Sequence, residues 1–187
     1  MAPYYLCVVQ DWEGRYVLGW SMGRNMNVGL CLRALEMALG SGYHPGIFNT
    51  DQGSQYTSEE WQSAILTKGI QISMDGKGRW ADNIIMERFW RTYKHEFFLH
   101  REPRNLEEAI IMTAEWFEYY NKERPHFSSD YLSPQMYRDE AALPLAANFW
   151  RDFSAPAQLA ALGTQRLHAT PTLQNRAKNG LTSGDTE

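Results

Sequence analysis

The chain has 187 residues with a formal net charge of −4, and 43% of its residues are hydrophobic. This length suits one domain with a sizeable core and is marginal for two. No apolar run approaches the ~20 residues that span a bilayer, and nothing at the N-terminus resembles a signal peptide, so we predict no association with a membrane and a cytoplasmic location. Cys7 and Cys31 lack metal-site spacing and are expected to be buried thiols.

The net charge argues weakly against a nucleic-acid partner, because basic surfaces supply most non-specific affinity for DNA. The charges are unevenly distributed, however. Basic residues gather in one region of the sequence: Lys77, Arg79, Arg88, Arg91 and Lys94.

The first half of the chain begins with strand-like segments. Residues 4–10 and 15–22 are rich in apolar and aromatic side chains and flank the turn signal DWEG, which predicts an antiparallel hairpin. Apolar residues recur at helical spacing over 27–39. Residues 46–50 then predict a short strand that ends at Asp51.

Two further helices and a strand follow. Thr57 and Glu60 resemble a capping box that opens a helix, and residues 70–73 have the composition of a strand. After a loop with two glycines, Asp82 is expected to cap a helix over about 83–98.

One more helix is expected over roughly 105–122. The element order predicts an α/β domain with a mixed sheet flanked by helices. We place this domain over residues 1–140 and a C-terminal extension over 141–187. The extension becomes rich in Ala, Thr, Asn and Gly, which predicts that it is largely disordered from about residue 155.

Two acidic residues lie at positions that are typical of ligand or metal sites. Asp51 follows a strand, the usual place for a ligand site in an open α/β sheet. Glu87 lies in a predicted helix, and Arg91 and Lys94 follow it at spacings that put all three on one face. A carboxylate with two cations suits a metal ion that activates a phosphate.

Each of these features has a simpler explanation. An Asp before Gly and Ser is most often a turn residue. Glu87 and Arg91 have the spacing of a solvated ion pair, and Arg91 with Lys94 is typical of an exposed charged face. For Asp11, in DWEG, a turn role is strongly favoured.

Three motifs, in order, carry a resemblance to a known family: TDQGSQYTS (50–58), GKGRWADNIIMERFW (76–90) and YYNKERPHFSSDYLSP (119–134). Together they resemble the integrase-type catalytic core of bacterial insertion-sequence transposases, which have an acidic triad (Asp, Asp, Glu) and are related to retroviral integrases. In that family thirty-five residues separate the second and third acids, and thirty-five lie between Asp51 and Glu87.

The resemblance implies a ribonuclease H-like fold and metal-dependent cleavage and strand transfer of DNA. It implies that Asp51 and Glu87 are catalytic carboxylates that hold Mg²⁺ or Mn²⁺, and that DNA is contacted by four cations: Lys77, Arg79, Arg91 and Lys94. The family's first acid lies on a strand upstream of residues 4–10. No residue of this chain matches it, so we expect the sheet to lack its first strand, a two-metal site only if that acid is supplied, and an inactive chain in isolation.

The implied partners are DNA (element ends and target) and further protein chains, through self-association or pairing with full-length transposase. The alternative interpretation is a non-catalytic DNA-binding or transposase-interacting remnant.

Overall fold

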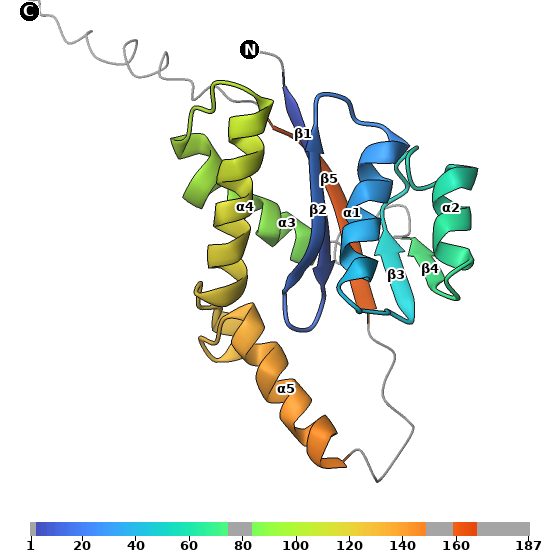
Figure 1. Cartoon of the computed structure of the whole chain (residues 1–187), viewed down its shortest axis with the longest axis vertical. Coiled ribbons are helices and arrows are strands. Elements are labelled where there is room, and N and C mark those ends of the chain that lie inside the picture. Colours follow the sequence, from blue (N-terminus) through green and yellow to red (C-terminus); the bar gives the residue numbers. More distant parts are fainter. Residues whose placement is uncertain (1–2, 75–83, 149–158, 168–187) are drawn as a thin grey trace, which may run out of the picture.

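The computed structural model of the chain describes residues 3–74, 84–148 and 159–167, with side chains as far as residue 141. In chain order its principal elements are β1 (Tyr4–Asp11), β2 (Val17–Gly23), α1 (Val28–Gly40), β3 (Ile47–Thr50), α2 (Glu59–Leu66), β4 (Gln71–Met74), α3 (Ile84–Thr92), α4 (Leu106–Lys122), α5 (Pro134–Asn148) and β5 (Leu159–Leu167) (Figure 1).

The strands form one mixed sheet in the order β2-β1-β5-β3-β4. β1 is antiparallel to both of its neighbours, β2 and β5. β3 is parallel to both β5 and β4. Figure 1 shows α3 and α4 on one side of the sheet and α1 and α2 on the other, which is the expected layered α/β arrangement.

β1 is buried on both faces, and its side chains alternate between two hydrophobic clusters. Tyr4, Leu6 and Val8 pack with aromatic residues of α3 and α4. Cys7 and Val9 face the other way and pack with apolar residues of α1 and α2. Because strand side chains point alternately to opposite faces, this single strand connects both halves of the core.

Most predicted elements are confirmed within a few residues. The hairpin, the helices α1 and α4, and the short strands β3 and β4 lie where the sequence placed them. The capping residue of α2 differs: Ser58, not Thr57, accepts the hydrogen bond from Trp61 N at 3.3 Å. α5 was not anticipated. Asp82 and the loop 75–83 lie outside the described residues.

The helix expected over about 83–98 changes its geometry part-way. α3 ends at Thr92, a π-helical turn covers Tyr93–Phe97, and a 3₁₀ turn covers Phe98–His100. Tyr93, Phe97 and Phe98 are all buried. The π-helical and 3₁₀ turns thus end the helix with these aromatic side chains in the core.

β5 corrects the expectation of disorder from about residue 155, which is wrong for residues 159–167. β5 lies in the centre of the sheet, between β1 and β3. Its backbone pairs with all of β1, from Tyr4 with Leu167 to Asp11 with Ala160, and with β3 at Leu159–Ala161. A central position between two strands satisfies backbone groups on both sides, a gain that segment composition does not reveal.

A tight contact between the sheet and α1 generates a first prediction. A Cβ at Gly19 would clash with the carbonyl oxygen of Ala34 and would lie 2.5 Å from the amide nitrogen of Ala38. We expect Gly19→Ala to lower the free energy of unfolding by about 2 kcal/mol or more, because backbone atoms must move. Gly40→Ala is the matched control: nothing lies within 4 Å of its Cβ position. Equal denaturant midpoints for the two variants would contradict this packing.

A second prediction concerns β5. Ala161 pairs with Gln10 on one side and with Asn49 on the other. Because proline removes a ladder hydrogen bond and fits poorly in a central strand, Ala161→Pro should destabilise the protein by about 3 kcal/mol in thermal unfolding. Ala161→Ser keeps the N–H and should behave nearly as the parent chain. Identical melting temperatures for the two variants would exclude this strand from the sheet.

Candidate functional site

Asp51 lies directly after β3 and is exposed. Its Oδ1 accepts a hydrogen bond from Gly53 N at 2.8 Å, which is the turn geometry typical of Asp. A Cβ at Gly53 would lie 2.9 Å from both Asp51 Oδ1 and Gln55 Oε1, so a larger residue there would displace these side chains from their present positions. The turn fixes one carboxylate oxygen and leaves the side chain at the surface, so the turn role and a ligand role are compatible.

Glu87 is exposed in the first turn of α3. The helix is held by the opposite, buried face, where Met86, Phe89 and Trp90 pack into the core. Among the described residues, three ion pairs are present, and they join other residues: Arg104–Glu108, Lys122–Glu118 and Arg124–Glu96. The simple ion pair between Glu87 and Arg91 is therefore not formed.

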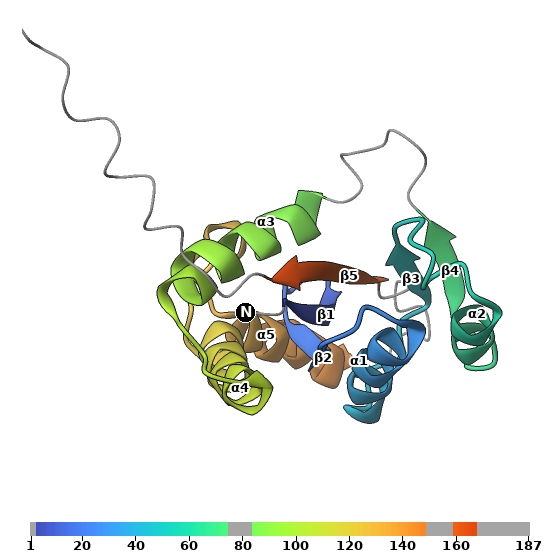
Figure 2. The same cartoon turned by 90° about the horizontal axis from the view of Figure 1, so that it is seen from above.

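β5 separates the two elements that carry these acids. β3, which precedes Asp51, is the parallel neighbour of β5, and α3 contacts β5 and lies over it (Figure 2). None of the nine residues of β5, LAALGTQRL, is acidic. The strand between the two candidate ligands thus contributes no third carboxylate, and no group of three or more potential metal ligands occurs among the described residues.

The structure describes two of the four cations predicted to contact DNA. Arg91 is exposed on α3, whereas Lys94 is partly buried and lies in the π-helical turn. The change of helix geometry after Thr92 therefore alters the simple i, i+7 relation between Glu87 and Lys94. Lys77 and Arg79 lie outside the described residues.

The segment after α4 forms a polar cluster that spacing in the sequence did not reveal. Arg124 donates two hydrogen bonds to Glu96, at 2.8 Å from Nε and 2.6 Å from Nη2. These bonds hold the pKa of the Glu96 carboxyl below its usual value. His126 packs edge-on against Tyr120, with ring centroids 4.8 Å apart.

A polar cavity of about 280 Å³ adjoins this cluster and is also lined by Gln10, Arg15 and Arg88. None of these three was predicted as a site residue. Gln10 and Tyr120 are 110 positions apart in the sequence but hydrogen-bond at 2.9 Å. Only the folded chain brings such residues together, and no local motif signals the cavity.

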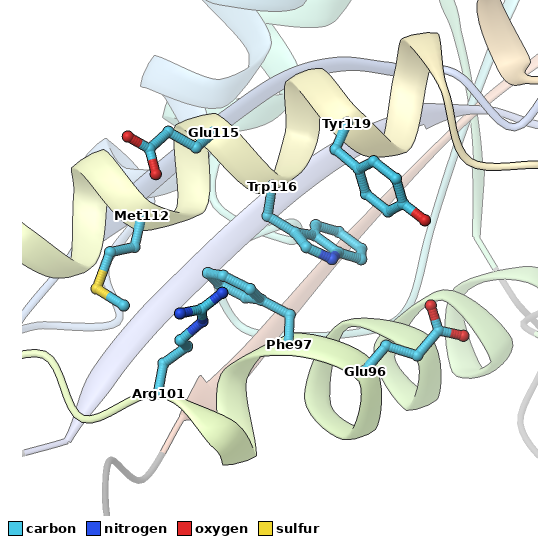
Figure 3. A pocket seen from close by; sticks show the side chains of 7 residues that line it. All are labelled: Glu96, Phe97, Arg101, Met112, Glu115, Trp116 and Tyr119. Atoms are coloured by element: carbon cyan, nitrogen blue, oxygen red, sulfur yellow. The ribbon is translucent and has the colours of Figure 1, made fainter.

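A second cavity, of about 420 Å³, lies between α4 and the segment that follows α3 (Figure 3). Trp116 and Phe97 stack there with centroids 5.8 Å apart, and Arg101 lies over the Phe97 ring. Glu96, Glu115 and Tyr119 complete the polar part of its wall. It contains none of the predicted site residues.

His126 generates a pH prediction. Burial, with the nearby charges of Arg124 and Arg15, lowers its pKa to about 4, whereas an unfolded histidine titrates near 6.5. The unfolded chain therefore binds more protons between these values, so stability contributed by neutral His126 is present above pH ~6.5 and is lost as pH falls towards 4. After allowance for solvent screening, we expect a loss of about 1–2 kcal/mol.

The measurement is the free energy of unfolding at pH 7 and pH 4.5 for the parent chain and for His126→Asn. The variant should lose less stability over this interval. Parallel pH profiles would show that His126 does not titrate differently on folding.

Two family models, both described as integrase core domain, match residues 1–79 and 68–134. The transposase for insertion sequence element IS904 of Lactococcus lactis is 40% identical over 134 residues, which cover 70% of this chain and 53% of the relative. Transposase InsF of insertion sequence IS3fB from Escherichia coli is 35% identical, with coverage of 73% and 48%. The chain thus spans about half the length of these relatives.

Solved structures share the fold at lower identity. The simian T-cell lymphotropic virus intasome, in complex with PP2A regulatory subunit B56 gamma, matches with a TM-score of 0.61 and 17% identity, covering 72% of this chain and 48% of the other. The HTLV-2 integrase catalytic core domain in complex with magnesium matches with a TM-score of 0.55 and 18% identity, covering 71% and 84%.

In the described part of the chain, no helix is both long and apolar enough to cross a membrane. The mixed sheet with helices on both faces is the ribonuclease H-like fold of the retroviral integrase catalytic cores. The sequence matches and the fold together identify residues 1–134 as an integrase-type core that resembles that of bacterial insertion-sequence transposases.

Proposed function

We propose that this chain is the catalytic portion of a DNA transposase, which acts in metal-dependent cleavage and strand transfer at element ends. The observation that carries the proposal is the pair Asp51 and Glu87. Both acids are exposed, neither is in an ion pair among the described residues, and they lie on elements that flank β5. The relatives named as transposases support the same assignment.

The donor set suits a hard divalent cation. Mg²⁺ prefers oxygen ligands, keeps several waters, and is usually held by one or two carboxylates together with substrate phosphates. Asp51 and Glu87 supply two such carboxylates, and the hydrogen bond from Gly53 orients the first. A structural neighbour is described as a complex with magnesium. We therefore propose Mg²⁺ or Mn²⁺ as the cofactor.

The proposed reaction has two phosphoryl-transfer steps. A water oxygen first bonds to phosphorus, the bond to the 3′-oxygen breaks, and the proton ends on the freed 3′-hydroxyl. That hydroxyl then attacks a phosphodiester of the target and releases another 3′-hydroxyl. Divalent ions bound there would activate the attacking oxygen and neutralise the leaving one. In this chain Asp51 and Glu87 would hold the ion, and Arg91 and Lys94 would hold the DNA backbone, with Lys77 and Arg79 as further DNA contacts.

The chain by itself is proposed to be inactive in strand transfer, because β5, the strand beside β3, offers no carboxylate. A two-metal site would then require an acid from another segment or chain. Self-association, or pairing with a full-length transposase on DNA in the cytoplasm, is the corresponding proposal for its partners.

The absence of an acidic residue from β5 also favours a second candidate function. A core whose sheet is complete without a third acid can bind DNA or transposase without cleaving DNA. Under this alternative the chain is a non-catalytic remnant, and its cations retain their role while its carboxylates do not.

Metal binding separates the two candidates. Under the first, Mn²⁺ titration of the 187-residue chain should show weak binding, which Asp51→Asn and Glu87→Gln each reduce by at least about tenfold, since loss of a group that only orients a metal ligand already costs about 10–100-fold. Glu107→Gln, an exposed acid in the first turn of α4, is the matched control and should leave the affinity unchanged. Equal affinities for all four proteins would refute the ligand assignment.

An oligonucleotide assay tests the reaction. A radiolabelled element end should remain intact with the chain alone and Mg²⁺, and should be cut when a segment with the missing acid is joined to its N-terminus. Cleavage by the unextended chain would overturn the proposed inactivity. Cleavage by neither protein would favour the DNA-binding alternative.

A further inference from the structure

The polar cavity of about 280 Å³ beside α3 has an unusual concentration of positive charge. It is bounded by the turn after β1, by α3, and by the segment after α4, and each contributes one arginine: Arg15, Arg88 and Arg124. No aspartate or glutamate lines it among the described residues. Three like charges around one cavity repel one another unless an anion offsets them.

The neighbouring acids offset only part of this charge. Glu96 engages Nε and Nη2 of Arg124 from outside the cavity. Arg15 donates from Nη1 to the carbonyl oxygen of Trp12, which carries no formal charge. Arg88 forms no ion pair with a described residue. Burial lowers the pKa of the Arg15 guanidinium, and the charge of Arg88 also lowers it. Nearby acidic groups raise this pKa and oppose part of the effect.

A buried amide adds a second, independent requirement. Gln10 lines the cavity with 0% of its surface exposed. Its Nε2 donates to Arg15 O at 2.8 Å and to the Tyr120 hydroxyl at 2.9 Å, but its Oε1 has no hydrogen-bond partner among the described residues. A buried acceptor without a partner is costly, so the cavity calls for a ligand that also donates a hydrogen bond.

The remaining lining fits a small polar ligand. Thr92 and Ser128 add hydroxyl groups, and Phe89 and Tyr120 provide aromatic surface. We propose that this cavity binds a phosphate ester that carries a free hydroxyl: the phosphate accepts from the three arginines, and the hydroxyl donates to Gln10 Oε1. Guanidinium groups suit phosphate because their fixed N–H donors match its oxygens.

This site does not depend on the proposed metal site. Ile84, Arg88 and Thr92 are spaced four residues apart and line the cavity, whereas neither Glu87 nor Arg91 is among its lining residues. Binding can therefore be measured in EDTA, where failure of the metal-site assignment has no effect.

The experiment is isothermal titration calorimetry of the full chain in EDTA at constant ionic strength, with ribose 5-phosphate, inorganic phosphate and ribose as probes. We expect ribose 5-phosphate to bind about tenfold more tightly than inorganic phosphate, and ribose not to bind. Arg88→Gln should weaken ribose 5-phosphate binding about tenfold. Arg33→Gln removes the same charge from an exposed position on α1, outside the cavity, and should leave the affinity unchanged.

Two sources share this chemistry: a free sugar phosphate, and the phosphorylated end of a DNA strand. A short oligonucleotide with a 5′-phosphate is compared with the same strand ending in a 5′-hydroxyl. A preference for the phosphorylated end that Arg88→Gln abolishes assigns the strand end, and no preference alongside ribose 5-phosphate binding assigns the free ligand. Absence of ribose 5-phosphate binding, or equal losses in the Arg88 and Arg33 variants, would overturn the proposal.

Discussion

The fold depends on β1 being paired along both edges and buried on both faces. Its backbone bonds to β2 and β5, and its side chains enter both hydrophobic clusters. A strand in this position cannot shift its register by one residue, since every side chain would then exchange one core for the other. The helices on both sides therefore have a fixed platform, and the positions of α3 and the end of β3 relative to each other follow from it.

Local patterns in the sequence predicted most of this platform. The hairpin follows from two apolar runs around DWEG, and α1 and α4 follow from apolar residues at helical spacing. Asp11 has the turn role that was favoured for it, accepting from Gly14 N at 2.8 Å. These features depend on neighbours in the sequence, which is why sequence reasoning finds them.

Features that depend on distant residues were missed. β5 forms by pairing with β1 and β3. The sequence of the strand, LAALGTQRL, does not by itself indicate that these partners are present. The π-helical turn ends at Phe97, which stacks on Trp116 of α4, a residue distant in the sequence. Motifs and spacing in the sequence indicated the two acids and the two described cations of the candidate site. The polar cavity beside α3 was not predicted, because its residues come from segments that are about 110 positions apart.

The pairing of β1 with β5 also constrains the order of folding. Tyr4 pairs with Leu167 across the sheet, so one edge of β1 stays unpaired until β5, one of the last described segments, has been synthesised. Forming such a contact closes a very long loop, and folds rich in long-range pairs fold slowly. During synthesis the hairpin must therefore persist with an open edge, a period in which another strand, from the same chain or a second one, can compete for the centre of the sheet.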